Sequence, residues 1–206
     1  MTRLSIVRTS DYRRVRWKND GGWTTEIARE PANGDDFRWR VSIADIESDG
    51  PFSTFPGVAR ELMLLSGNGI ELDIDDAPPL RLTERFQRVH FEGEARVDCR
   101  LLAGPTRDFN VMTRRDAVRA EVMARPLVGP MVLFAETDVV WLAHVFSGNA
   151  EARADMTRTA LDIGDTLRID FAARDAGRVI IEGSGEIVLV KLMPAARHDA
   201  SSSASD

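Results

Sequence analysis

The feature that most constrains the fold of this chain is a two-residue alternation of apolar and polar side chains. The segments 37–44, 70–75 and 97–101 all alternate in this way. Successive side chains of a β-strand point to opposite faces, so this period predicts strands with one buried face. The segments 62–65, 139–142 and 187–190 are short and almost wholly apolar, which is typical of strands buried on both faces. The chain is therefore predicted to be all-β.

Turn signals separate these strands. Asn33-Gly34 lies between the segments 23–30 and 37–46 and predicts a hairpin. The acidic run 73–76 before Pro78-Pro79 is typical of a solvated hairpin end. The best helical candidate is Asp116–Ala124, although it carries two β-branched valines and no clear cap. The tail 195–206 has almost nothing to bury, and we expect it to be disordered.

A faint internal repeat suggests two similar units. Ser66-Gly67-Asn68 and Ser147-Gly148-Asn149 each follow an apolar run, and the segment 89–93 resembles 179–183. Two such units would be β-barrels or sandwiches that close their edges as a jelly roll does. We expect an N-terminal barrel over residues 1–115, a C-terminal barrel over 116–194 and the tail, with an approximate boundary and strands that can be exchanged between the barrels.

Charge and composition exclude several classes of function. The chain has 27 Lys and Arg against 33 Asp and Glu, a net charge of −6. Such a chain repels phosphate backbones and anionic lipids, so we expect no nucleic acid and no membrane as partner. The N-terminus lacks the apolar core of a secretory signal, which favours a cytoplasmic location. Cys99 is the only cysteine, and its apolar strand neighbours favour a buried structural thiol.

Metal and nucleophile chemistry is poorly supported. The three histidines are His90, His144 and His198, and none has another at helical or alternate-strand spacing. A catalytic metal takes about three protein ligands, so we expect no metal and no other cofactor. Gly183-Ser184-Gly185 lacks the spacing of a nucleophile elbow, and phosphate-loop and dinucleotide fingerprints are absent.

Three other segments combine polar side chains with apolar walls. The first, 17–26, surrounds a Gly pair that allows a tight backbone conformation. In the second, Arg60 starts a buried run and can point into a barrel mouth, where it would need an anion. A surface or salt-bridged Arg60 is the alternative. In the third, Asp108, Asn110 and Met112 share one strand face, for which solvent is the alternative.

The same segments resemble the HutD/Ves family, which is named for a histidine-utilisation protein of proteobacteria and a stress-inducible relative. The resemblance is carried by Trp17-Lys18-Asn19 with Gly21-Gly22, by the segment 39–44, by Gly50-Pro51-Phe52-Ser53 with Phe55-Pro56-Gly57 and Arg60, and by the segment 108–112 with Arg115. It implies a bacterial bicupin, two jelly-roll cupin barrels in one chain, without the usual metal-binding histidines.

The chain departs from the family at Asp20, where the family usually has Gly. If that position needs a positive φ, Asp can adopt it at modest cost. If the missing side chain makes room for a ligand, the binding role of this loop changes.

The leading hypothesis is a metal-free cupin that binds a small carboxylate metabolite, similar to formylglutamate, and modulates histidine catabolism. Arg60 is the expected carboxylate anchor. The other candidate ligand-binding residues are Lys18, Asn19, Asn110, Phe55, Trp17, Arg40, Ser42 and Arg115.

Two alternatives remain open. One is a metal-independent isomerase or hydrolase of an amino-acid derivative, with Glu26 or Asp108 as general base. The other is an interaction protein without a ligand site, acting as a homodimer through an exposed sheet edge.

Overall fold

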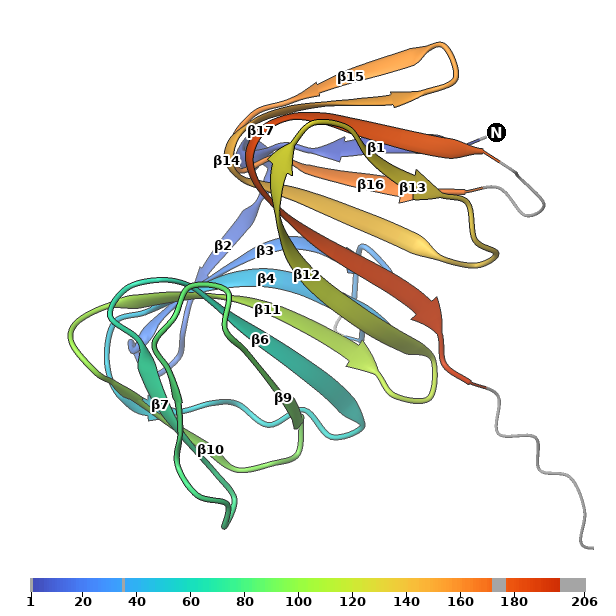
Figure 1. Cartoon of the computed structure of the whole chain (residues 1–206). Helices are drawn as coiled ribbons and strands as arrows, with labels where there is room; N and C mark the ends of the chain where they lie inside the picture. Colours follow the sequence, from blue (N-terminus) through green and yellow to red (C-terminus); the bar gives the residue numbers. More distant parts are fainter. Residues whose placement is uncertain (1, 35, 172–176, 197–206) are drawn as a thin grey trace, which may run out of the picture.

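The computed structural model describes residues 2–34, 36–171 and 177–196. Apart from one 3-10 turn, η1 (Thr9–Asp11), the regular elements of these residues are strands, so the all-β prediction is confirmed (Figure 1). They form three antiparallel sheets. The predicted disordered tail lies outside the described residues from position 197 onward. Within the described part, no helix is long and apolar enough to cross a bilayer.

The six-stranded sheet forms the middle of the molecule (Figure 1). Its strands, in spatial order, are β2 (Arg13–Arg16), β3 (Gly22–Glu30), β4 (Trp39–Ile46), β11 (Thr106–Arg114), β6 (Val58–Ser66) and β9 (Arg88–Glu92). β3 and β4 are the predicted hairpin, and Gly34 in their connection has φ of +97°. A positive φ is costly for most residues other than glycine, which explains the Asn-Gly signal.

The four-stranded sheet covers one face of the six-stranded sheet. Its order is β5 (Gly50–Pro51), β10 (Val97–Leu101), β7 (Ile70–Ile74) and β8 (Leu80–Leu82). Side chains of both sheets form one core, to which Leu62 and Leu64 contribute from β6, Leu72 from β7 and Cys99 from β10. Burial raises the pKa of the Cys99 thiol to about 12, which confirms the predicted inert, buried cysteine.

The seven-stranded sheet lies on the other side (Figure 1). Its order is β1 (Arg3–Val7), β16 (Thr166–Asp170), β14 (Val140–Ala154), β17 (Arg178–Pro194) and β12 (Val118–Val128), with β13 (Met131–Phe134) paired to β17 and β15 (Thr157–Leu161) paired to β14. β1 starts the chain yet pairs with β16, so the N-terminus is exchanged into the C-terminal half.

The helix predicted over Asp116–Ala124 is wrong. Most of this segment belongs to β12, which pairs along its whole length with β17. Val118 and Val122 are buried in the core that the six- and seven-stranded sheets share. β-branched side chains suit a pleated, half-buried surface better than a helix, and the long partner strand supplies the backbone hydrogen bonds.

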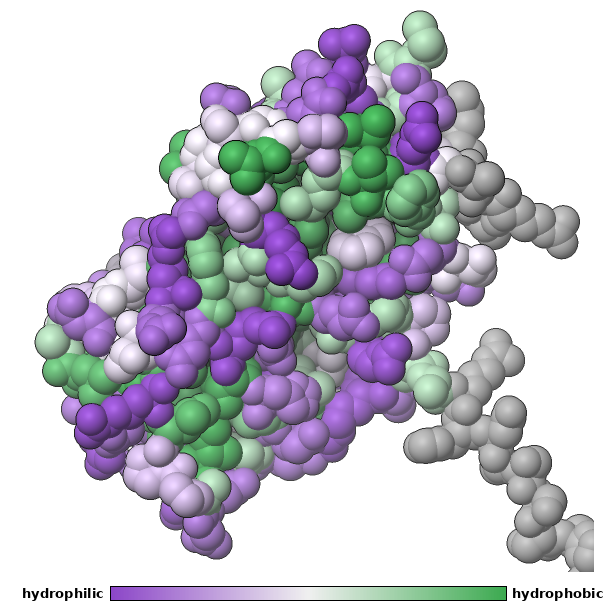
Figure 2. All heavy atoms as spheres, in the orientation of Figure 1, coloured by the Kyte–Doolittle hydropathy of each residue, from purple (hydrophilic) through white to green (hydrophobic). Residues whose placement is uncertain are grey.

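The two larger sheets pack face to face through that shared core. β4 and β11 contribute Val41 and Phe109, and β14 and β17 contribute Leu142 and Val188. A separate apolar core fills the seven-stranded sheet where it folds over on itself. On one surface of the molecule, hydrophobic residues (green) gather over the seven-stranded sheet and over the lower sheets, with hydrophilic residues (purple) between them (Figure 2).

The expectation of two closed barrels is not confirmed. In the described residues the three sheets are open in their hydrogen bonding rather than closed on themselves. The two marks of the internal repeat also differ, because Ser66-Gly67-Asn68 begins at the last residue of β6 whereas Ser147-Gly148-Asn149 lies inside β14 at a shift of register.

Candidate ligand-binding site

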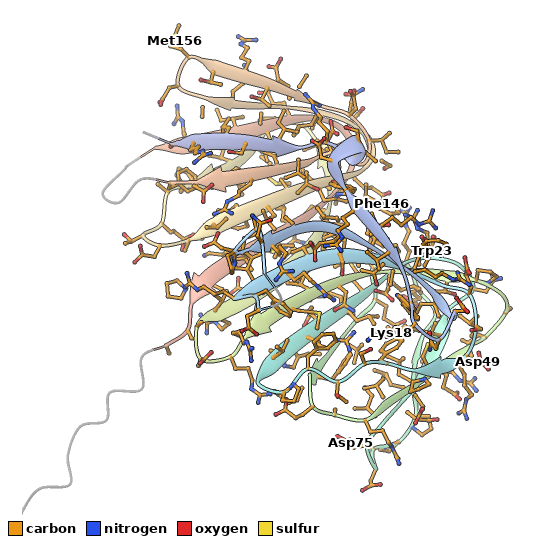
Figure 3. The ribbon with its side chains drawn as sticks, turned by 180° about the vertical axis from the view of Figure 1, so that it is seen from behind. Lys18, Trp23, Asp49, Asp75, Phe146 and Met156 are labelled. Atoms are coloured by element: carbon orange, nitrogen blue, oxygen red, sulfur yellow. The ribbon has the colours of Figure 1, made fainter. Side chains whose placement is uncertain are left out.

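A cavity of about 710 Å³ opens on the face of the six-stranded sheet that is turned away from the seven-stranded sheet. Strands β2, β3, β4, β11 and β6 supply its floor, and the segments 16–19 and 51–55 supply its rim. In Figure 3, Lys18 lies beside this sheet, at the end of the molecule where Asp49 is also labelled. Ten of the eleven predicted residues line the cavity: Trp17, Lys18, Asn19, Glu26, Arg40, Ser42, Phe55, Arg60, Asp108 and Asn110.

Arg115 is the predicted residue that the structure places elsewhere. It is exposed just beyond the end of β11 and pairs with Glu94, at 2.5 and 2.9 Å, and with Glu92. Because the chain turns after Arg114, Arg115 no longer follows the face of the strand that lines the cavity. Its candidate role in ligand binding is therefore corrected to a surface ion pair.

Strand register explains why residues far apart in sequence meet here. Asn110 on β11 lies opposite Ser42 on β4, which in turn lies opposite Glu26 on β3. Met112 lies between Arg40 and Arg60. Since side chains alternate along a strand, these residues share one face while their chain neighbours enter the shared core on the other face.

The polar face of β11 is buried, so the solvent alternative for it is wrong. Asp108 is 1% exposed, and Asn110 and Met112 are also buried. The alternation showed correctly that the three residues share a face. It did not reveal that loops and the four-stranded sheet cover this face.

Arg60 is buried without an ionic partner. It is 6% exposed, and no carboxylate of the described residues lies within ion-pair distance of it. Its Nη1 donates to the carbonyl oxygen of Ser53 at 3.3 Å, and its Nε has no hydrogen-bond partner. The guanidinium lies over the rings of Phe91, Phe52 and Phe55, with centroid distances of 4.8, 5.4 and 5.8 Å. The surface and salt-bridged alternatives for Arg60 are therefore wrong.

Burial lowers the pKa of Arg60 to about 10, and the charge of Arg40 acts in the same direction while Asp108 opposes it. A guanidinium remains charged at neutral pH under these conditions. The site therefore holds a desolvated positive charge.

Arg40 adds a second cation on the same wall. Its guanidinium lies over Phe55 at 5.5 Å and over Phe37 at 5.4 Å, and Nη2 contacts the sulfur of Met112 at 3.3 Å. Its Nε has no hydrogen-bond partner, and burial lowers its pKa. The ring of Phe55 is thus in contact with the buried Arg60 and with the half-buried Arg40.

Two buried acceptors complete the floor. Among the described residues, neither Oδ1 of Asp108 nor Oδ1 of Asn110 has a hydrogen-bond partner. Burial raises the pKa of Asp108 to about 7, partly offset by the charge of Arg60. Glu26 is only half-buried and lies 4.0 Å from Arg29. Buried polar groups in proteins are normally satisfied, so four unpartnered atoms around one cavity point to a ligand.

The segment 17–22 adjoins the cavity, with residues 17–19 on its rim, and is held by hydrogen bonds within itself and to β3. Trp17 donates from Nε1 to Thr24 Oγ1 at 2.8 Å, and Asn19 Oδ1 accepts from the backbone of Gly21 at 3.1 Å. Asp20 has φ of +56° and an exposed side chain that pairs with Arg16. At this position Asp therefore replaces the usual Gly in a backbone conformation with positive φ. Its side chain does not line the cavity.

Several lining residues were missed at the level of the sequence, among them Arg13, Thr24, Arg29 and Phe52. Thr24 precedes Glu26 by two residues, so the two-residue period of a strand places both side chains on one face of β3. With these residues the cavity lining carries six Lys or Arg side chains and two carboxyl groups, a strongly positive pocket in an acidic chain.

The arrangement suits the binding of an anion with a small apolar body. Two desolvated guanidinium groups can form bidentate hydrogen bonds with a carboxylate, and the phenylalanine rings can contact the rest of the ligand. In the described residues, no group of three His, Cys, Asp or Glu side chains is placed to hold a metal ion.

Comparison with known proteins places these features in context. The sequence profile of the HutD family matches residues 9–189. An uncharacterised 21.2 kDa protein of the hutC 3′ region of Pseudomonas putida is 36% identical over 194 residues, which cover 94% of this chain and 99% of that protein. Protein Ves of Citrobacter koseri is 42% identical over 107 residues, which cover 52% of this chain and 56% of Ves.

Solved structures agree. The structure of HutD from Pseudomonas fluorescens SBW25 superposes with a TM-score of 0.78 at 31% identity, covering 94% of this chain and all of that one. A bacterial pirin from Escherichia coli, at 10% identity and a TM-score of 0.70, and an oxalate decarboxylase from Lactobacillus farciminis, at 9% and 0.64, share the fold alone. The fold is therefore cupin-like.

Proposed function

Because the chain belongs to the HutD family, we propose that its cavity binds a small carboxylate metabolite, similar to formylglutamate, and that the bound protein modulates histidine catabolism. The observation that carries this proposal is the buried guanidinium of Arg60, which faces the cavity without a carboxylate partner. The link to histidine rests on the HutD relatives. We also propose that the two halves of the chain correspond to two cupin units.

The burial of Arg60 carries a cost in free energy. An ion in a low-dielectric interior loses several kcal/mol of hydration free energy unless a partner compensates for it. Rings beneath the guanidinium recover about 0.5–2 kcal/mol, which is less than this loss. A ligand carboxylate that pairs with Arg60 would restore the balance, so the cavity is suited to an anion.

Arg40 and the ring of Phe55 define the rest of the expected ligand. A second guanidinium on the same wall suits a second anionic or carbonyl oxygen, and the ring suits a short aliphatic chain between the two polar ends. A cavity of about 710 Å³ lies within the usual range for small-molecule sites. A dicarboxylate derived from an amino acid has these properties.

Thermal-shift measurements test the proposal directly. Histidine, urocanate, formiminoglutamate, formylglutamate and glutamate are each added at millimolar concentration. A bound ligand at 100 times its dissociation constant adds about 2.7 kcal/mol, which raises Tm of a chain of this size by roughly 5–10 °C.

The matched variants are Arg60→Met and Arg115→Met. Both remove one guanidinium, but Arg115 lies outside the cavity in a surface ion pair. The thermal shift should disappear in Arg60→Met and persist in Arg115→Met. Absence of a shift with all five compounds in the wild-type protein would overturn the proposal.

An enzyme remains the second candidate, because Asp108 is buried in the same cavity as Arg60 and its pKa lies at about 7. General acid–base catalysis is most efficient when the pKa of the group is close to the working pH. Asp108→Asn and Glu26→Gln should then abolish turnover of a bound panel compound without abolishing its binding. Turnover at the wild-type rate in both variants would exclude these assignments. An interaction protein without a ligand site is less favoured, since the cavity is open and Arg60 forms no ion pair with a carboxylate of the described residues.

A further inference from the structure

We propose that Asp108 is a second ligand-contacting group of this cavity, which holds a proton and donates a hydrogen bond to the carboxylate bound at Arg60. Binding of a carboxylate then requires the acid form of Asp108 and takes up a proton from solvent when that form is not already populated. The inference rests on the proposed function, because it describes how the same site recognises its anion.

The position of Asp108 disfavours its charged form. It pairs with Ala44 on β4 and Leu64 on β6, so its immediate strand neighbours are aliphatic. Its side chain is 1% exposed, it forms no ion pair with an arginine of the described residues, and Oδ1 has no hydrogen-bond partner. A buried carboxylate without such partners loses its hydration without compensation, so the neutral acid is favoured.

The surrounding charges do not reverse this preference. The charged and titratable groups that face or flank Asp108 are Arg60 on β6, Arg40 and Asp45 on β4, Glu26 on β3, Cys99 on β10 and Arg107 on β11. Burial has the largest effect and raises the pKa of Asp108, and the charge of Asp45 acts in the same direction. The charge of Arg60 lowers this pKa, and the net result is a pKa of about 7. Cys99 stays a neutral thiol across the neutral range, since its pKa is about 12.

A bound anion strengthens the preference for the acid form. An ionised Asp108 would place a second negative charge beside the ligand carboxylate, whereas the acid form offers an O–H donor. The bound ligand therefore raises the pKa of Asp108 further. Above the pKa of the free group, each pH unit should weaken binding roughly tenfold until the pKa of the complex is reached.

Isothermal titration calorimetry with N-formyl-L-glutamate tests this coupling. Titrations are made at pH 6 and pH 8, each in two buffers of different ionisation enthalpy, which reports the number of protons taken up. Both ligand carboxyl groups are ionised at either pH, so any proton uptake belongs to the protein. The wild-type protein should bind about tenfold more weakly at pH 8 than at pH 6 and take up close to one proton at pH 8.

Two variants isolate Asp108. Asp108→Asn keeps a hydrogen-bond donor and cannot ionise. Its affinity for N-formyl-L-glutamate should therefore be equal at pH 6 and pH 8, with no proton uptake. If Asp108→Asn does not fold, Asp108→Ser replaces it. Glu61→Gln is the matched control, because Glu61 adjoins Arg60 on β6 but pairs with Arg88 and His90 outside the cavity. It should retain the wild-type pH dependence.

The outcomes separate this inference from the proposed function. Equal wild-type affinity at pH 6 and pH 8 without proton uptake, or coupling that persists in Asp108→Asn, would overturn the role of Asp108 and leave carboxylate binding intact. Failure of every carboxylate in the thermal-shift panel to bind would overturn the proposed function, and the role of Asp108 with it.

Discussion

At the scale of single residues, burial decides what a given side chain does. Arg60 and Arg115 both belong to segments that resemble the same family, yet one faces the cavity and the other pairs with glutamates on the surface. Exposed ion pairs contribute about 0–1 kcal/mol. A desolvated arginine without an ionic partner instead attracts an anion strongly.

His144 shows the same principle outside the cavity. It is 3% exposed on β14, its Nδ1 lies 2.9 Å from Thr166 Oγ1, and its ring contacts Phe109 at 5.7 Å between centroids. Thr166 also bonds with the hydroxyl of Tyr12 at 2.7 Å, so this network ties the N-terminal segment to the seven-stranded sheet. The histidine therefore has a structural role in this network.

Burial lowers the pKa of His144 to about 4, against about 6.5 in an unfolded chain. The folded state favours the neutral ring, so this contribution to stability is complete above pH 6.5 and is lost as the pH falls toward 4. The free energy of unfolding of the wild-type protein, relative to that of His144→Gln, should fall by about 3 kcal/mol between pH 7 and pH 4. Urea denaturation at both pH values measures it.

The wild-type protein is compared with His144→Gln because the titration of Asp108 changes the free energy of unfolding in the opposite direction. Its raised pKa makes ionisation costly to the folded state, so its contribution falls as the pH rises from about 4 to about 7. That contribution cancels in the comparison with His144→Gln. A difference that does not change with pH would show that His144 is not held neutral by burial.

At the scale of elements, β14 and β17 are long enough to serve both the shared core and the separate core of the seven-stranded sheet. Their pairing shifts register between Val145 and Ser147. Close backbone approach at this shift requires glycine at Gly148, Gly183 and Gly185, where an added Cβ would overlap a carbonyl oxygen of the opposite strand. The Ser-Gly-Asn sequence there is thus a bend within a strand.

Gly148→Ala tests this close approach. Gly148 has φ of +77°, and a Cβ there would overlap the carbonyl oxygen of Ser184. Gly104 has φ of +80°, with nothing within 4 Å of its Cβ position. Both substitutions incur the strain of a positive φ, about 1–2 kcal/mol, but only Gly148→Ala adds a backbone clash.

Thermal unfolding should therefore show a loss of more than about 3 kcal/mol, or failure to fold, for Gly148→Ala and about 1 kcal/mol for Gly104→Ala. Equal losses in the two variants would mean that β14 and β17 do not approach as closely as described.

At the scale of the whole molecule, the two larger sheets share a core instead of forming independent units. Leu142 and Val188 of the seven-stranded sheet pack with Val41 and Phe109 of the six-stranded sheet. β1 also crosses from one end of the sequence to the other half of the fold (Figure 1). Neither half can bury its shared face alone, so the chain should unfold in one cooperative step.

Trp141→Phe provides the measurement. Trp141 lies in the separate core of the seven-stranded sheet, and the three remaining tryptophans lie in or beside the six-stranded sheet. Fluorescence then reports the N-terminal sheets, and far-ultraviolet circular dichroism reports all strands. The two urea midpoints should coincide. Separate midpoints would show that the halves unfold independently.

The sequence by itself determined the all-β class and, for the strands that it predicted, which side chains share a face, because a strand alternates its side chains with a fixed period. Ten of the eleven residues singled out from the sequence also line the cavity, although the cavity has further lining residues that the sequence did not single out.

Only the tertiary structure decided what covers each face. Asp108 and Arg60 are buried because the rim loops and the four-stranded sheet cover their side of the sheet, and Asp116–Ala124 is a strand because β17 lies beside it. A local period states which side chains share a face, whereas burial, pKa and partner depend on elements distant in the sequence.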